Sequence, residues 1–261
     1  MYKILFPEAN NDYIQSVAAT LKEQGSCEPI LDTLDCAAAG QKLAAGEADA
    51  MVAGVDFSSR DVILACRDYV GVAGQTNPEE KKTFSSLFVA DFPDGRRFIV
   101  ADGATCKNPT VEQLVDIIML VHAAAKKLLN DEPRVALLSF STFGSGGKDP
   151  SIDKMAEAIR LVRERDPSIK IDGEMQLDAA VNPRIGAKKA PQGSEVAGRA
   201  NVLVTPDITS GNILYKSLEQ FAGAKLAGPI LLGFNKPVSD LSRGSTPEDI
   251  VFTTECLIKL I

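Results

Sequence analysis

Short apolar runs alternate with segments of helical periodicity along almost the whole chain. The runs Lys3–Phe6, Ala50–Val55 and Arg134–Phe140 are rich in aliphatic residues and too short to be core helices. Amphipathic stretches of about 10 to 15 residues separate such runs, and parallel strands need a crossover of that length. The alternation therefore predicts an α/β fold with largely parallel sheets.

One pair of runs departs from this pattern. Ser85–Asp91 and Arg96–Asp102 flank Pro93-Asp94-Gly95, a turn typical of hairpins, so we expect one antiparallel pair there. The polar segment Gly71–Lys82 precedes the pair and is a candidate domain boundary. The other expected strands are Pro29–Leu31, Ile169–Asp172, Asn201–Thr205 and Pro229–Phe234. The first three expected helices begin after the N-cap Asp12, after the cap Ser58 and at the capping box of Thr110 and Gln113. The others cover Ser151–Arg165, Ala179–Lys188, Ser210–Phe221 and Pro247–Leu260.

Charge and composition exclude several classes of protein. The chain carries 28 Lys and Arg against 35 Asp and Glu, so its formal net charge is −7. An acidic surface argues against binding to nucleic acid or to anionic membranes. No apolar stretch reaches the ~20 residues that cross a bilayer, and the first ten residues lack the pattern of a signal peptide. We therefore expect a cytoplasmic protein without a membrane or nucleic-acid partner.

Cysteine and histidine usage restricts the chemistry further. The five cysteines are scattered and form no CxxC pair, which is typical of reduced thiols. The single histidine, His122, lies among aliphatic residues of an expected helix, so a structural role is favoured over a chemical one. No G-x-G-x-x-G follows a strand. These observations predict that neither a metal nor a nicotinamide is needed.

Three loops after expected strands are dense in polar groups: Ser139–Gly147, Thr205–Asn212 and the loop that runs from Asn235 to Thr246. Ligands of open parallel sheets bind at such loops. The first is either an ordinary Ser/Gly loop or a source of anion-binding donors, and Asp207 or Ser210 in the second can simply cap the next helix. In the third, Arg243 offers a planar fork suited to phosphate, with Ser242 beside it.

Asp249 follows that loop, and its role has two possible interpretations, helix cap or base. Thr246 as N-cap, Pro247 at the first helical position and Asp249 at the third make a good helix start. The spacing alone favours this capping role over a role as a base. The two roles are compatible, because a carboxylate at a helix start can also accept a proton.

Four segments resemble the phosphate acetyl/butyryltransferase family. They read RVALLSFST, DGEMQLDAA, KKAPQGSEVAGRANVLVTPDITSGNILYK and GPILLGFNKPVSDLSRGST, and the similarity runs with gaps from Ile4 to the C-terminus. The resemblance implies two α/β/α domains of the isocitrate/isopropylmalate dehydrogenase-like type with the active cleft between them. Residues 1–76 with 229–261 would form the first domain, and residues 77–228 the second.

The resemblance also implies a reaction and its residues. Family enzymes move an acetyl or butyryl group between phosphate and coenzyme A by direct thiol attack in a ternary complex, with coenzyme A and acyl phosphate as substrates and no cofactor. Asp249 would be the base toward the thiol, and Ser242 with Arg243 would bind and polarise the acyl phosphate. The expected substrate-binding residues are Ser139, Ser141, Thr142, Gly144, Asp207, Asn212, Asn235 and Lys236. Family members usually form homodimers. The alternative is a relative that binds coenzyme A or acyl phosphate without turnover.

Two positions depart from the family pattern. Leu64 stands where the family carries a phosphate-binding arginine, and Arg60 and Arg67 are candidates to replace it. Phe143 stands in place of a lysine. The loss of these cationic groups implies either a longer or less polar acyl group at Phe143 or weak binding of phosphate. The chain is also shorter than the acetyltransferases between Leu34 and Ala50.

Overall fold

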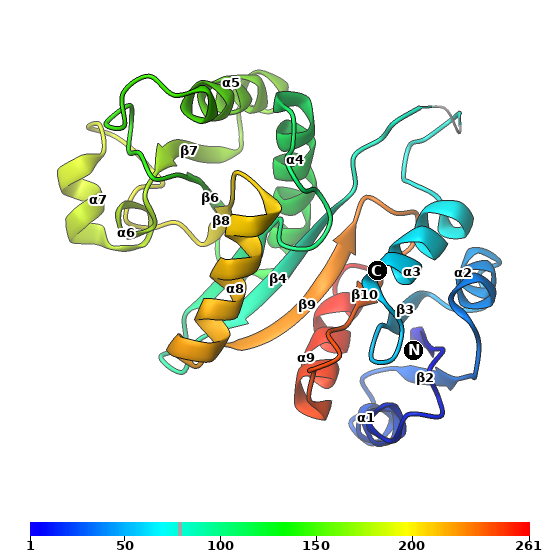
Figure 1. Ribbon diagram of the computed structural model, residues 1–261. Coiled ribbons are helices and arrows are strands. Elements are labelled where there is room, and N and C mark those ends of the chain that lie inside the picture. Colours follow the sequence, from blue (N-terminus) through cyan, green and yellow to red (C-terminus); the bar gives the residue numbers. More distant parts are fainter. Residues whose placement is uncertain (78–79) are drawn as a thin grey trace. The chain divides into compact units, whose positions relative to one another are not determined.

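The computed structural model describes residues 1–77 and 80–261 of the chain (Figure 1). These residues divide into two compact units. Unit 1 comprises Met1–Phe84 and Lys225–Ile261, and unit 2 comprises Ser85–Ala224. The domain boundaries expected at 76/77 and 228/229 stay a prediction, and residues 78 and 79 of the expected linker lie outside the described part.

Unit 1 contains a mainly parallel sheet in the order β2-β1-β3-β10-β9. Strands β2, β1, β3 and β10 run parallel to one another, whereas β9 is antiparallel to β10. The strands span Lys3–Phe6 (β1), Glu28–Leu31 (β2), Ala50–Ala53 (β3), Lys225–Leu232 (β9) and Val238–Asp240 (β10). The helices span Asp12–Glu23 (α1), Cys36–Ala44 (α2), Ser59–Ala65 (α3) and Pro247–Ile258 (α9), and a π-helix covers Cys66–Val70.

Helices cover both faces of this sheet. Alternate strand residues such as Leu5 and Met51 pack with Val62 of α3 in one buried cluster. The intervening Ile4 and Val52 are also fully buried, and α9 contacts β3 and packs against α1. The predicted inward face of α1, with Ile14, Val17, Ala18 and Leu21, is confirmed by its burial.

Three expectations for unit 1 were wrong. The N-cap of α1 is Asn11 rather than Asp12, because the Asn11 side chain accepts the Tyr13 N–H at 2.9 Å. Helix α2 was not expected, although its Ala-rich sequence has high helix propensity and Asp35 caps it. The loop expected from Asn235 to Ser245 contains strand β10, whose three residues are all buried. A strand of three residues, two of them polar, has no readable periodicity.

Unit 2 contains a sheet in the order β4-β5-β8-β6-β7. The expected hairpin is confirmed as the antiparallel pair β4 and β5, and the remaining pairs are parallel. The strands span Ser85–Asp91 (β4), Arg97–Ala101 (β5), Arg134–Leu138 (β6), Lys170–Met175 (β7) and Val202–Val204 (β8). The helices span Val111–Leu128 (α4), Pro150–Arg165 (α5), Leu177–Val181 (α6), Pro183–Lys189 (α7) and Ile208–Ala222 (α8).

Local sequence chemistry explains the helix boundaries of unit 2. The capping box of Thr110 and Gln113 is present at the start of α4. The single helix expected over Ala179–Lys188 is wrong, because Pro183 has no N–H and ends α6, and Asn182 then caps α7. His122 is buried in α4, and burial lowers its pKa. All five cysteines are free thiols.

Candidate active site

The carboxyl ends of three neighbouring parallel strands meet at one edge of the unit 1 sheet. Glu8 follows β1, the loop from Gly54 to Ser58 follows β3, and the segment from Leu241 to Thr246 follows β10. The Leu241 N–H donates to the Ala53 carbonyl at 2.6 Å, which joins the last two segments directly. Loops at this edge of a parallel sheet are where ligands bind.

Ser242 and Arg243 are both exposed on the β10–α9 segment. The Ser242 Oγ accepts the Gly244 N–H at 3.3 Å, a long contact that leaves the hydroxyl proton available. Among residues 1–77 and 80–261, the Arg243 guanidinium has no hydrogen-bond or ion-pair partner. Both side chains can therefore reach an external anion.

Asp249 performs the capping role expected from the spacing. Its Oδ2 accepts the Thr246 N–H at 3.0 Å and the Thr246 hydroxyl at 2.7 Å, while the Thr246 Oγ1 accepts the Asp249 N–H at 3.2 Å. The residue is half-buried. Within the described residues its Oδ1 takes part in no hydrogen bond, so one oxygen remains free to accept a proton.

The other two candidates of unit 1 differ from each other. Asn235 is engaged within the protein, since its Nδ2 donates to the Val70 carbonyl at 3.0 Å and its N–H to the Gly71 carbonyl at 3.0 Å. It fixes the start of the segment to the end of the π-helix. Lys236 is half-buried, and its ammonium has no partner in the described part of the chain.

In unit 2, the hydroxyl oxygens of the loop after β6 accept hydrogen bonds from backbone N–H groups of the same unit. The Ser139 Oγ accepts the Ser141 N–H at 3.1 Å, and the buried Ser141 Oγ accepts the Gly146 N–H at 2.8 Å. The buried Thr142 Oγ1 accepts the Gln176 N–H at 3.0 Å. The Gly144 N–H donates to Glu174 Oε1 at 2.8 Å. Most of these polar groups therefore shape the loop.

Phe143 adopts a left-handed backbone conformation in the same loop, with φ of 47°. Such a conformation is unfavourable for a large side chain and persists only where the surroundings impose it. Its side chain packs at the edge of a buried cluster that includes Ala179 and Ala180. The residue in place of the family lysine is thus held by the core of unit 2.

The loop after β8 is also engaged within the chain. Asp207 is the N-cap of α8, and its Oδ1 accepts the Ser210 N–H at 2.8 Å. The Asn212 amide donates to the Gly103 carbonyl at 3.4 Å and to the Tyr215 hydroxyl at 3.3 Å. The helix-capping interpretation of Asp207 is confirmed by this geometry.

Leu64 lines a cavity of about 440 Å³ in unit 1 whose polar walls are acidic. Asp35, Asp61 and Asp68 lie around it, so no cation replaces the missing arginine among its lining residues. Arg67 lies in the π-helix, which alters the helical phase after Leu64, and it pairs with Asp68 at 2.7 Å. Arg60 is exposed and has no partner within residues 1–77 and 80–261.

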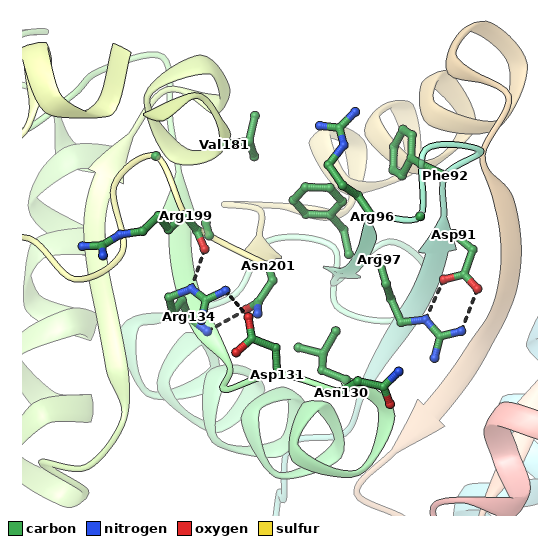
Figure 2. Close-up of a pocket in the computed structure, with 15 residues that line it drawn as sticks. Asp91, Phe92, Arg96, Arg97, Asn130, Asp131, Arg134, Val181, Arg199 and Asn201 are labelled. Carbon is green, nitrogen blue, oxygen red and sulfur yellow. Dashed lines mark hydrogen bonds and ion pairs between the residues drawn. The ribbon is translucent and has the colours of Figure 1, made fainter. Parts of the chain in front are cut away.

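A second cavity, of about 500 Å³, lies at the amino ends of β5, β6 and β8 in unit 2 (Figure 2). Arg97 forms a two-bond fork with Asp91, and Arg134 donates to Asp131 and to the Arg199 carbonyl. None of the residues expected from the sequence to bind substrate lines it. It lies at the opposite edge of the sheet from the loops after β6 and β8.

The described residues contain neither a cluster of metal ligands nor a helix that could cross a membrane. No group of three or more His, Cys, Asp or Glu side chains in residues 1–77 and 80–261 is placed to hold a metal ion. In the same part of the chain, no helix has the length and apolar character required to span a bilayer.

Comparison with known proteins decides the family. The family model described as "Phosphate acetyl/butaryl transferase" matches residues 32–257. This chain belongs to that family. The phosphate acetyltransferase of Treponema pallidum is 43% identical over 85% of this chain and 66% of its own length. That of Clostridium acetobutylicum is 44% identical over 79% of this chain and 61% of its own length. The chain thus spans less than two thirds of these relatives.

Solved structures support the assignment to the phosphate acetyl/butyryl transferases. A phosphotransacetylase from Streptococcus pyogenes superposes with a TM-score of 0.85 at 31% identity, over 99% of this chain and 93% of that one. A 4-hydroxythreonine-4-phosphate dehydrogenase from Burkholderia phymatum, 14% identical, gives a TM-score of 0.50 over 100% of this chain and 96% of that one, a likeness of fold alone. The expected α/β fold of the dehydrogenase-like type is confirmed.

Sequence reasoning missed two buried carboxyl groups at the unit 1 edge. Glu8 is 6% exposed and accepts four backbone N–H groups, and Asp240 is 1% exposed. Burial raises the pKa of Asp240 to about 6. The one available signal was the position of Glu8 just after the apolar run Ile4–Phe6, and Asp240 had no such signal. That signal does not distinguish a buried carboxyl from a solvated one.

Proposed function

We propose that this chain transfers a short acyl group, acetyl or butyryl, between phosphate and coenzyme A by direct attack of the thiol in a ternary complex. The observation that carries the proposal is the exposed Arg243 beside Ser242, one short loop before Asp249, with no partner for its guanidinium in the part of the chain that the structure describes. A guanidinium with free donors is suited to bind a phosphate in a bidentate manner. Its position in a phosphate acetyl/butyryl transferase sequence supports this use.

Asp249 is the proposed base. A thiol has a pKa near 8.5, so most of it is protonated at neutral pH and needs an acceptor. The free Oδ1 of Asp249 takes the thiol proton as the sulfur attacks the acyl carbon. The carbon–sulfur bond forms, the carbon–oxygen bond to phosphate breaks, and phosphate leaves with the electron pair. A positioned base of this kind contributes ~10²–10⁴-fold in rate.

Ser242 and Arg243 stabilise the charge that develops in this step. The Ser242 hydroxyl donates to the carbonyl oxygen as it becomes anionic, a contribution worth ~3 kcal/mol. Arg243 binds the phosphate oxygens before the bond breaks and favours the departure of phosphate. Both groups interact more strongly with the transition state than with the ground state, as catalysis requires.

The remaining candidates take supporting roles in this proposal. The engaged side chains of Ser139, Ser141, Thr142, Asp207, Asn212 and Asn235 hold their loops in shape, and the backbone of Gly144 does the same. Lys236 is the charged candidate whose ammonium has no partner within residues 1–77 and 80–261, and we assign it to attraction of the anionic substrates. Coenzyme A and acyl phosphate are the substrates and no cofactor is required. A homodimer and a cytoplasmic location remain predictions.

Phe143 bears on the length of the acyl group. An apolar ring in place of a lysine favours butyryl over acetyl in this proposal. The variant Phe143→Lys should therefore shift the ratio of kcat/KM values from butyryl toward acetyl. An unchanged ratio would show that Phe143 does not determine the preference for acyl length.

The test of the proposal is release of the thiol from acetyl-CoA and butyryl-CoA in the presence of inorganic phosphate. We expect release that depends on phosphate and is lost in Arg243→Ala. A folded wild-type protein that releases no thiol from either substrate would contradict the proposed activity and favour binding without turnover.

A further inference from the structure

Glu8 occupies an unusual position for a charged residue. It lies two positions after the end of β1 and is buried, and its carboxylate is surrounded by backbone donors. Oε2 accepts the N–H groups of Gly54 at 2.8 Å and Val55 at 3.3 Å, and Oε1 accepts those of Asp56 at 2.6 Å and Phe57 at 2.8 Å. One side chain thereby satisfies four consecutive donors of the loop after β3.

This carboxylate serves the loop and not the following helix. Helix α3 has its own cap, because the Ser58 Oγ accepts the Asp61 N–H at 3.2 Å. Successive backbone N–H groups that converge in this way form a concave anion-binding nest. Burial of a charge is costly unless hydrogen bonds compensate it, and here the four donors do so. Within the described residues no cation pairs with Glu8.

The loop that Glu8 holds touches the segment with the proposed catalytic groups. Gly54 has φ of +111°, and a Cβ on it would lie 2.7 Å from the Leu241 nitrogen and 2.8 Å from Asp240 Oδ1. The Leu241 N–H donates to the Ala53 carbonyl, the residue before Gly54. Ser242 and Arg243 follow Leu241 immediately. A shift of the loop therefore moves the backbone on which they are mounted.

Asp240 supports the functional importance of this contact. Within residues 1–77 and 80–261 neither of its carboxyl oxygens has a hydrogen bond of normal length, although the residue is almost fully buried, and the Ser59 side chain only partly offsets the burial that raises the pKa of Asp240. A buried carboxyl group with so little compensation is destabilising, so its retention beside Gly54 calls for a reason. Proteins keep such costs at functional sites, where local rules are broken for the sake of geometry.

We propose that Glu8 is a positioning residue: by filling the nest of Gly54–Phe57, it fixes the loop against Leu241 and thereby orients Ser242 and Arg243 for the acyl phosphate. This inference rests on the proposed function. Glu8 itself does not touch the substrate in this account. The distance over which it acts is short, because a single backbone contact joins its loop to the reactive segment.

Removal of the carboxylate and its replacement from solution give the first test. Glu8→Ala leaves four donors facing an empty nest, and we expect kcat/KM for acyl phosphate to fall by ~10²-fold, as a misplacement of about 1 Å does. Formate should restore part of this activity and raise the melting temperature, because it supplies a carboxylate to the nest. Glu8→Gln should also lose activity but gain nothing from formate, since its amide still fills the space.

A matched control is available in the same unit. Asp49 also accepts a backbone N–H, from Lys3 at 2.8 Å, but it is half-exposed and precedes β3, at the opposite edge of the sheet from the reactive segment. Asp49→Ala should keep kcat/KM within about twofold and show no formate rescue. The wild-type protein with formate corrects for any direct effect of the anion on the assay.

The variant Glu8→Ala with Arg243→Ala tests the route of the effect. Because Glu8 acts in part through Arg243, Glu8→Ala should cause a smaller loss of activity in the Arg243→Ala background than in the wild type. An active wild type with an equally active Glu8→Ala or additive losses in the double variant would overturn the positioning role and leave the proposed function intact. An inactive wild type would overturn both. Should Glu8→Ala fail to fold, Glu8→Gln carries the test: it should lose kcat/KM for acyl phosphate at an unchanged KM for coenzyme A, and normal activity in it would overturn the role.

Discussion

The polar loops of the two units differ in what their side chains contact. In unit 1, Ser242 and Arg243 are exposed, and among the described residues the guanidinium has no partner. In unit 2, Thr142 and Asp207 hydrogen-bond to backbone groups of their own unit. Loops of similar composition therefore divide into one that presents free groups and others that hold themselves in shape. Substitutions should reduce turnover in the first and stability in the others.

The largest expected effect falls on Arg243. Arg243→Ala should lower kcat/KM by ~10²–10³-fold, because the charge-assisted bonds to phosphate are lost at the transition state. Arg243→Lys should recover little, since an ammonium cannot form the planar fork. Steady-state kinetics and a melting curve for each variant check this. A fully active Lys variant would show that the planar guanidinium fork is not needed. A large loss of melting temperature in Arg243→Ala would show that Arg243 has a structural role.

A second difference between the units concerns pH and stability. Burial raises the pKa of Asp240 from 3.8 to about 6. Between these values the folded state keeps a proton that the unfolded state has lost, so the free energy of unfolding falls as pH rises. The cost is complete above about pH 6 and amounts to about 3 kcal/mol at most. Asp240→Asn should remove this slope in denaturant titrations from pH 4 to pH 7.

Asp149 in unit 2 provides the comparison of opposite sign. The Ser151 hydroxyl and N–H lower the pKa of Asp149, so its stabilising contribution is present at neutral pH and lost in acid. Asp149→Asn should therefore lower stability at pH 7 and have less effect at pH 3. If the two substitutions changed the pH dependence of the free energy of unfolding in the same direction, the opposite effects expected for Asp240 and Asp149 would be contradicted.

Thr142 tests whether the unit 2 loop is structural. Thr142→Val keeps the shape of the side chain but leaves the half-buried Gln176 N–H without its acceptor, which costs about 1 kcal/mol. Turnover measured well below the melting temperature should stay within a few-fold of wild type. A loss of turnover without a loss of stability would transfer Thr142 to the groups that act on substrate.

Features of the fold that depend on residues close together in the sequence could be predicted, whereas features that depend on distant residues could not. The capping boxes of Thr110 and Thr246 are local patterns and were predicted correctly, as was the hairpin turn. Strand β10 was missed because its pairing with β3 joins residues far apart in sequence. Ser242 and Arg243 were recognisable from their motif, and the structure adds that they are exposed.

Glu8 shows the limit most clearly. Its four donors lie 46 to 49 residues further along the chain, and no periodicity links them to it. The acidic surroundings of Leu64 could not be predicted from the sequence either, because the aspartates that line its cavity come from separate helices and loops. Tertiary contacts of this kind are set by the assembled sheet, and a local window of sequence does not contain them.

The pH dependence of Asp249→Asn tests the central claim most directly, because capping and catalysis predict different outcomes. As a base, Asp249 is essential: the Asn variant should keep a nearly normal melting temperature and substrate KM, lose ~10²-fold or more in kcat at pH 7, and recover in part at high pH, where the thiolate needs no acceptor. If Asp249 only caps the helix, Asp249→Asn should lose ~1 kcal/mol or less of stability and keep its turnover. Full turnover of Asp249→Asn at pH 7 would contradict the account and leave the thiol proton without an acceptor.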